Sequence, residues 1–250
     1  MDSTELQRKH FNTLQAAYTK HYGDEWSTEY VERFNLAPTF EGMNLQSLSI
    51  LDAMCGPGQA TAFLRKQGAS QITGLDISNN MVETYIARNP GCSGQQGSVT
   101  ALPFPDESFD VVVVSAGLHH LHPHLDEGLQ EIYRVLKKGG AFCFWEPFSG
   151  SLMDKVRRIW YRFDRKMMAE NERSVDLEVL KMNYSDRFNF EIEKYSGGIP
   201  YLLVLQSLVL RIPHGLKRFY CPLFLTLESW IGKSWPKYLS CIVSMRARKK

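Results

Sequence analysis

Strand-like and helix-like patterns alternate along the middle of this 250-residue chain. The clearest strand is residues 111–114, four consecutive valines, as expected for a strand buried on both faces of a parallel sheet. Such alternation predicts parallel strands joined by right-handed crossovers, with helices on both faces. The predicted elements are strands 48–53, 71–76, 95–98, 109–115, 141–146, 189–196 and 239–245 and helices 58–67, 78–88 and 125–138.

The regions outside this alternation are predicted to be helical. Residues 3–36 carry an apolar stripe at spacings of three and four, which Pro38 and Gly42 close. Residues 147–187 are predicted to be a mostly helical scaffold and cap. The final strand is expected to be antiparallel, and residues 199–237 form a long insertion before it. The stripe consists of Phe11, Leu14, Tyr18 and Tyr22.

Composition limits the alternatives. A hydrophobic content of 44% suffices for one large domain or a domain with an attached subdomain. Five cysteines without C-x-x-C spacing suggest neither a disulfide framework nor a zinc site. The polar, acidic N-terminus does not resemble a signal peptide, and no apolar run approaches 18 residues, so a cytoplasmic protein without a transmembrane helix is expected.

The first strand leads into a glycine turn and a helix. Gly56 and Gly58 can adopt positive φ and bring backbone N–H groups close to a ligand, and the N-terminus of the following helix favours negative charge. Asp52 precedes the glycines, where it would repel a pyrophosphate but suit a cationic amino-acid head group. The third glycine of the dinucleotide-binding pattern is replaced by Thr61.

Asp76 ends the second strand, 18 residues after Gly58. A carboxylate there can accept both hydrogen bonds from a ribose diol, as in proteins that bind NAD. It therefore indicates an adenosine-containing cofactor without choosing its kind. The alternative is that Asp76 caps the next helix in competition with Ser78.

Three motifs resemble those of a known family. Residues 52–58 resemble the E/D-x-G-x-G-x-G signature of class I S-adenosylmethionine (SAM) methyltransferases, and residues 102–112 (LPFPDESFDVV) resemble a run of their UbiE-like, or methyltransferase type 11, branch. Residues 131–140 are similar to the family's R-V-L-K-P-G-G helix end, with Lys138 in place of proline, and predict a glycine-capped helix C-terminus. The resemblance is strong over about residues 45–147.

The resemblance implies an α/β, Rossmann-like fold with a seven-stranded, mostly parallel sheet of order 3-2-1-4-5-7-6. Residues 1–44 would be an N-terminal helical lid, in which Tyr18 either covers the ligands or packs on the domain. Residues 45–250 would be the SAM-binding domain, including the 147–187 cap and the 199–237 insertion. Ser98 stands where the family usually has an acid. The predicted cofactor-binding residues are Tyr18, Asp52, Ala53, Gly56, Gly58, Asp76, Ile77, Met81, Ser98, Val99 and Ser115.

Four of the seven histidines follow the fourth strand, in residues 119–124. Metal binding is disfavoured, because successive histidines on a turning loop point in different directions and no other ligand type lies at suitable spacing before Asp126. In the resembling family a His-containing loop here lines the methyl-transfer site. The candidate base is His120, with His119 or Glu146 as substitutes, because imidazole titrates near neutral pH. His122 and His124 are predicted to be surface residues.

These observations predict SAM-dependent methyl transfer to a small or amphipathic acceptor at O, N or C. The alternatives are an NAD-linked Rossmann oxidoreductase, against which Asp52 and the missing third glycine argue, and a non-catalytic SAM-binding protein. The acceptor is not specified by the sequence, and no nucleic-acid partner is expected.

The C-terminal part of the chain is basic. Residues 199–250 carry a charge of +8, which leaves −6 for residues 1–198. Within 199–237 two apolar helices are predicted, one over 201–210 and one from Pro222 onward. They fit a lid over a lipid-linked acceptor or a loose, in-plane contact with an anionic membrane, and alternatively packing on the sheet edge or a dimer interface.

Overall fold

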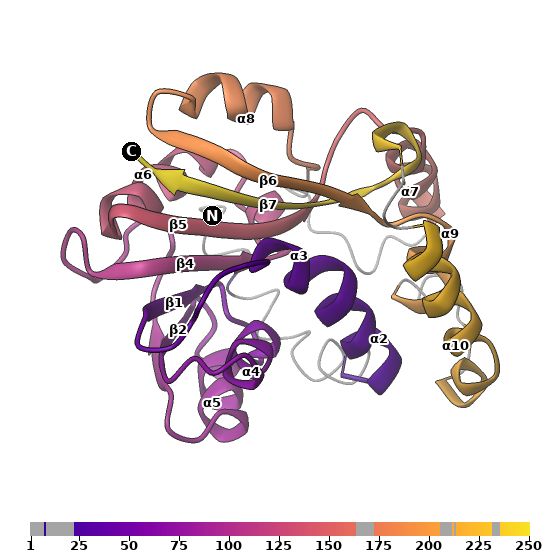
Figure 1. Cartoon of the computed structure of the whole chain (residues 1–250), viewed down its shortest axis with the longest axis horizontal. Coiled ribbons are helices and arrows are strands. Elements are labelled where there is room, and N and C mark those ends of the chain that lie inside the picture. Colours follow the sequence, from indigo (N-terminus) through magenta and orange to yellow (C-terminus); the bar gives the residue numbers. More distant parts are fainter. Residues whose placement is uncertain (1–7, 9–22, 164–172, 206–211, 213, 232–235) are drawn as a thin grey trace.

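The computed structural model describes residues 8, 23–163, 173–205, 212, 214–231 and 236–250. Its core is a seven-stranded sheet of order β3-β2-β1-β4-β5-β7-β6 (Figure 1). β7 is antiparallel to both neighbours and the other pairs are parallel, which confirms the predicted topology. The strands are β1 (Ser49–Ala53), β2 (Gln71–Asp76), β3 (Ser93–Gln96), β4 (Phe109–Ser115), β5 (Leu136–Pro147), β6 (Phe188–Ser196) and β7 (Ile242–Lys249).

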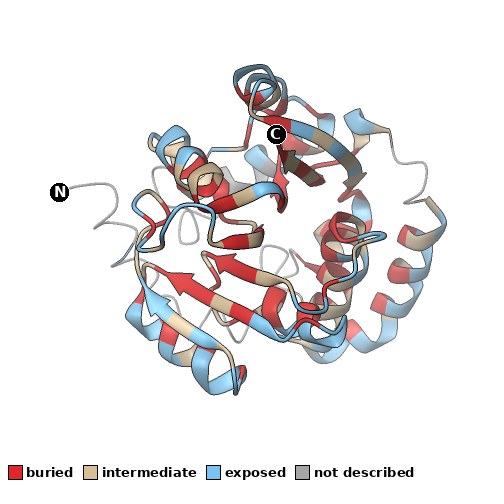
Figure 2. Ribbon diagram, turned by 60° about the vertical axis from the view of Figure 1, so that its left-hand side comes forward, coloured by how far each residue is buried: buried red, intermediate tan, exposed pale blue. Residues whose placement is uncertain are grey.

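Helices cover both faces of the sheet. Along β4, Val112 and Val114 belong to one apolar cluster and Val111 and Val113 to the other, because successive side chains point to opposite faces. Figure 2 shows the buried residues in the strands and on the helix sides that face them. The helical elements are α2 (Glu25–Tyr30), η1 (Val31–Leu36), α3 (Ala37–Thr39), α4 (Gln59–Lys66), α5 (Asn79–Arg88), η2 (Leu118–His120), α6 (Leu125–Val135), α7 (Leu152–Phe163), α8 (Leu177–Tyr184), α9 (Ile199–Val204), α10 (His214–Ile231) and η3 (Lys237–Leu239).

The predicted glycine cap after α6 is wrong. The helix ends at Val135, and Leu136 is already extended and pairs with Phe109 of β4. The ammonium group of Lys249, on β7, donates to the carbonyl oxygens of Tyr133 and Leu136 at 2.8 and 2.6 Å. A distant lysine therefore satisfies the helix-end carbonyls that a glycine motif would otherwise serve.

Other boundaries also differ from the prediction. The N-terminal helical region continues through Pro38 to Thr39, β3 begins two residues earlier, and β7 spans Ile242–Lys249 rather than 239–245. α10 does not begin at Pro222 but contains it. The predicted stripe of residues 11–22, including Tyr18, lies outside the described residues.

Polar contacts fix α10 on the rest of the domain. The buried carboxylate of Glu228 accepts a hydrogen bond from the hydroxyl of Tyr30 at 2.9 Å and one from the Gly197 backbone N–H at 3.2 Å. The ammonium group of Lys217, also buried, lies 2.7 Å from the carboxylate of Asp24. α10 is therefore attached at α2 through charged and polar side chains, and its Cys221 and Leu225 also belong to one of the two apolar clusters.

Gly74 tests the packing beneath the glycine turn. An alanine Cβ there would lie 2.4 Å from Cζ of Tyr85, so Gly74→Ala forces the ring to move. We expect the free energy of unfolding to fall by about 1–3 kcal/mol in urea denaturation, the range for overpacked interiors. Gly215→Ala in α10 is the control, because its Cβ would meet nothing within 4 Å and alanine favours helix. Equal effects would contradict this packing argument.

Candidate functional site

A cavity of about 280 Å³ lies beyond the carboxyl ends of the parallel strands. Ligands of open α/β sheets bind at this edge. The glycine turn, the ends of β2 and β4, and the histidine loop all contribute to its wall. Asp52, Ala53, His119 and Glu146 do not line it, and Tyr18 lies outside the described residues. The predicted residues that line the cavity are Gly56, Gly58, Asp76, Ile77, Met81, Ser98, Val99, Ser115 and His120.

The turn after β1 depends on its glycines. Gly56 and Gly58 have φ of +49° and +86°, the left-handed region that favours glycine. A Cβ on Gly58 would lie 2.1 Å from the amide nitrogen of Asn89, whereas one on Gly56 would meet nothing within 4 Å. Gly58 therefore permits α5 to pack closely behind the turn, and Gly56 leaves the cavity side open.

Asp76 connects the turn to the end of β2. Its Oδ2 accepts a hydrogen bond from the Gly56 N–H and its Oδ1 one from the Ser78 N–H, both at 2.9 Å. Burial raises the pKa of Asp76, against these N–H bonds and the charge of His120. Ser78, not Asp76, caps α5 by accepting a hydrogen bond from the Met81 N–H. Ser78 is therefore the residue that caps the helix, and Asp76 lines the cavity.

Asp52 lies below the turn instead of in the cavity. Its Oδ2 accepts hydrogen bonds from the backbone N–H and the hydroxyl of Thr61, at 3.1 and 2.7 Å, and the Thr61 hydroxyl lies 3.1 Å from that of Tyr85. Burial raises the pKa of Asp52 from 3.8 to about 7, although the bonds from Thr61 act in the opposite direction. The threonine that replaces the third glycine is thus the partner of this buried acid.

Glu146, at the end of β5, holds the histidine loop. Its Oε1 accepts hydrogen bonds from the Gly117 and Leu118 N–H groups at 2.6 and 2.7 Å, and its Oε2 lies 2.7 Å from Nδ1 of His119. Burial raises the pKa of Glu146 from 4.5 to about 7, opposed by the backbone bonds and by the charge of His120. Being fully buried, Glu146 positions the loop without reaching the cavity.

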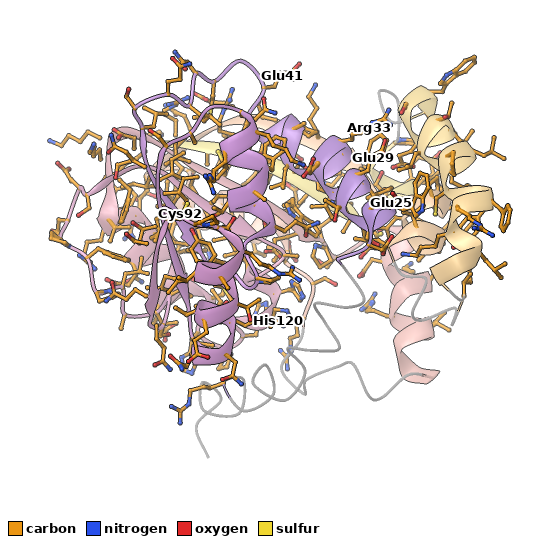
Figure 3. The ribbon with its side chains drawn as sticks, turned by 90° about the horizontal axis from the view of Figure 1, so that it is seen from below. Glu25, Glu29, Arg33, Glu41, Cys92 and His120 are labelled. Atoms are coloured by element: carbon orange, nitrogen blue, oxygen red, sulfur yellow. The ribbon has the colours of Figure 1, made fainter. Side chains whose placement is uncertain are left out.

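His120 is brought to the cavity by this arrangement (Figure 3). Its ring lies against that of His119, with centroids 3.9 Å apart. His122 and His124 were predicted as surface residues, but both are half-buried and line the cavity. Burial lowers the pKa of His122. Within the described part of the chain, no group of three or more His, Cys, Asp or Glu residues is arranged to hold a metal ion.

Trp145 and Gln59 were not predicted from the sequence as site residues. Both line the cavity, and the indole Nε1 of Trp145, the amide Nε2 of Gln59 and the hydroxyl of Ser115 are buried with no hydrogen-bond partner among the described residues. Buried polar groups are normally paired, so such groups around a cavity indicate a polar ligand. No hydrophobic periodicity in the sequence distinguishes these residues. Their only sequence signal is their position: Gln59 follows Gly58, Trp145 precedes Glu146, and Ser115 ends β4.

Comparison with known proteins identifies the family. A family model described as a methyltransferase domain matches residues 51–144. A demethylmenaquinone methyltransferase of Staphylococcus epidermidis is 32% identical over 175 residues, which cover 65% of this chain and 72% of that protein. The chain belongs to the class I SAM-dependent methyltransferases, in the methyltransferase type 11 branch. A Synechocystis methyltransferase is 33% identical over 130 residues, covering 47% of this chain and 61% of that protein.

A solved structure supports the fold of this methyltransferase domain. A SAM-dependent methyltransferase from Thermotoga maritima, a possible histamine N-methyltransferase, matches with a TM-score of 0.68 and 18% identity over 97% of this chain and 99% of that one. At this identity the likeness concerns the fold alone. The resemblance predicted from the motifs is confirmed, and family membership decides against the NAD-linked alternative.

S-adenosyl-L-methionine is the cofactor of this methyltransferase domain. The residues present fit it: a glycine turn open toward the cavity at Gly56, a carboxylate at Asp76, and a hydroxyl at Ser115 that has no hydrogen-bond partner in the part of the chain that the structure describes. The individual cofactor contacts, including Tyr18, stay predictions.

The raised pKa of Asp52 predicts a pH-dependent stability. The pKa of Asp52 in the folded state is about 7, above its ordinary value of 3.8. Protonated Asp52 therefore stabilises the fold fully below pH 3.8, and this stabilisation is lost as the pH rises through 7. Between pH 5 and 7 we expect Asp52 to lower the free energy of unfolding by about 2 kcal/mol. Asp52→Asn should remove this part of the pH dependence in urea unfolding. An unchanged difference between the two pH values would contradict the assignment.

Proposed function

We propose that this protein transfers the methyl group of SAM to an acceptor bound beside His120. The observation that carries the proposal is the position of His120, which lines the same cavity as the glycine turn and interacts electrostatically with both Asp76 and Glu146. Bound SAM would supply an already activated methyl group, so the chain has to orient the acceptor and exclude water.

Binding of the cofactor is assigned to the turn and to Asp76. Both Asp76 oxygens accept backbone N–H bonds, which hold the carboxylate in place, and a carboxylate has enough lone pairs to accept from a ribose diol as well. The Ser115 hydroxyl and the Gln59 amide, unpaired among the described residues, supply further polar contacts at the cavity wall.

Proton removal from the acceptor is assigned to His120. An oxygen or nitrogen acceptor that receives the methyl group of bound SAM would lose a proton, and the His120 imidazole would accept it. Glu146 is a positioning residue in this scheme, because it fixes the loop backbone and the ring of His119, against which His120 lies. His119 supports the ring that acts.

The acceptor class we propose is amphipathic, such as a quinone-type, lipid-linked or glycolipid molecule. The relative from Staphylococcus epidermidis is named as a demethylmenaquinone methyltransferase, which supports a quinone-type acceptor. Incubation with SAM labelled in the methyl group and separated lipid-extract fractions tests the class. Label in a lipid fraction, with formation of S-adenosylhomocysteine, supports it. Label confined to water-soluble fractions would overturn the acceptor class, and absence of S-adenosylhomocysteine with every fraction would favour the non-catalytic alternative.

Replacement of Asp76 tests the cofactor site. Asp76→Asn keeps one oxygen acceptor and the shape but removes the charge, and we expect SAM affinity to fall by about 10- to 100-fold, the scale of a lost charge-assisted hydrogen bond. Isothermal calorimetry measures the change. Asp110→Asn is the control, because Asp110 accepts from Ser49 and Lys137 away from the cavity. Equal affinity in Asp76→Asn and the wild type would place the ribose elsewhere.

Replacement of His120 tests the base. His120→Ala should lower kcat by about 100-fold or more with little change in SAM affinity, as expected for a lost general base. Turnover is measured with the labelled lipid fraction, and affinity by calorimetry. His119→Ala should have a smaller effect, because its ring only supports His120. If His119→Ala lowered kcat more than His120→Ala, the general base would be His119 instead of His120.

A further inference from the structure

α10 buries a mixed face against the protein. Lys217, Cys221, Leu225 and Glu228 are its buried residues, and two of these four carry charge. The charges are paired at Asp24, and hydrogen-bonded at Tyr30, within the interface with α2. Cys221 and Leu225 belong to one of the two apolar clusters of the domain, so polar and apolar contacts together fix this face of the helix.

The opposite side of α10 is apolar and exposed. Five residues at spacings of three and four fall within roughly 80° of arc at 3.6 residues per turn. Their exposed fractions run from 41% for Leu227 to 83% for Trp230. The polar contacts of Lys217 and Glu228 fix this orientation, so the exposure does not come from a loosely attached helix. We call these residues the α10 apolar stripe: Leu216, Phe219, Leu223, Leu227 and Trp230.

α7 repeats the pattern at the same end of the molecule. Leu152, Val156 and Ile159 are exposed at spacings of four and three. Figures 1 and 3, seen from perpendicular directions, both place α7 and α10 at one end of the domain, away from β1 to β3. Exposed apolar residues gathered along one side of a helix, as in the α10 apolar stripe, mark an interaction site.

The charges beside these apolar residues are positive. Lys155 of α7 and Arg218 of α10 are exposed, as is Arg158 of α7, which pairs with Asp154 at 3.2 Å. The acids of the described parts of these two helices, Asp154 and Glu228, are fully buried. The Arg218 guanidinium lies over the Phe219 ring, 4.7 Å from its centroid, at the border of the stripe.

Exposed acids of α2 lie near α10, and exposed Glu178 of α8 is paired with Lys237 of η3 at 2.6 Å. Glu25 and Glu29 lie on the side of α2 toward α10 in Figure 3, and Glu29 is paired with Arg33 at 2.8 Å. The exposed charges of α7 and α10 themselves therefore complement an anionic surface. Two copies joined through these faces would instead bring their exposed arginines and lysine together.

We propose that the exposed faces of α7 and α10 bind the surface of an anionic phospholipid bilayer. Apolar side chains would enter the boundary between headgroups and acyl chains, and the flanking basic side chains would contact lipid phosphates. No helix of the described residues has the length and apolarity needed to cross a bilayer, so the helices would lie in the plane of the surface. The proposal goes beyond methyl transfer and does not depend on the acceptor.

Vesicle sedimentation tests the proposal with the full chain. We expect binding to vesicles that contain phosphatidylglycerol, at least tenfold weaker binding to phosphatidylcholine alone, and weaker binding in 0.5 M salt, a concentration at which screening extends over only about 4–5 Å. The double substitution Phe219→Glu and Leu223→Glu should weaken binding at least tenfold, because it places two carboxylates at the apolar boundary.

Met182→Glu on α8 is the matched control. Met182 is also strongly exposed, and α8 lies away from α10 in Figure 1. It should leave binding unchanged, and unaltered circular dichroism and SAM affinity in each variant would exclude unfolding. Absence of binding to anionic vesicles, or equal losses in the control and the double variant, would overturn the proposal. So would a wild-type dimer in light scattering that the double variant converts to monomer without any vesicle binding, because the occupant would then be a second copy of the chain.

Discussion

The site depends on three buried carboxylates that hold three loops at the carboxyl edge of the sheet. Asp52 binds the backbone and hydroxyl of Thr61 at the start of α4, and Asp76 binds the N–H groups of Gly56 in the glycine turn and of Ser78 at the start of α5. Glu146 gathers the N–H groups at the start of the histidine loop. Each acid lies at the end of a buried strand, so the rigid sheet fixes the position of each loop.

This arrangement has an energetic cost that a cationic ligand would offset. Burial raises the pKa of Asp52 and Glu146 to about 7, because ionised carboxylates lose hydration that the N–H donors replace only in part. A cofactor with a sulfonium and an ammonium group favours the ionised forms. The same acids therefore order the loops and suit a positively charged cofactor, which a pyrophosphate-binding turn would not require.

Local sequence patterns predicted correctly those strands whose bounds are determined by their own residues. β2 and β4 have the predicted bounds, because their ends coincide with a switch from apolar to polar residues. The end of α6 was not predictable, because the ammonium group that satisfies its carbonyls comes from Lys249, more than a hundred residues later. In the site, the position of Asp76 at the end of the second strand could be predicted from the sequence. The hydrogen bonds between Asp52 and Thr61 could not, because they depend on where α4 lies relative to β1.

The orientation of α10 was also beyond local patterns. Apolar residues extend around most of this helix, so periodicity alone does not choose the buried side. The buried side is the one on which Lys217 and Glu228 find partners at α2. Cys221 and Leu225 join the apolar core on that same side. α2 also contributes Thr28 to the cavity wall. Because one helix contacts both regions, a surface bound at α10 is held in a fixed position relative to the cavity. Under the proposed membrane contact, that geometry would suit an acceptor whose polar head reaches His120 while its apolar part stays in the bilayer.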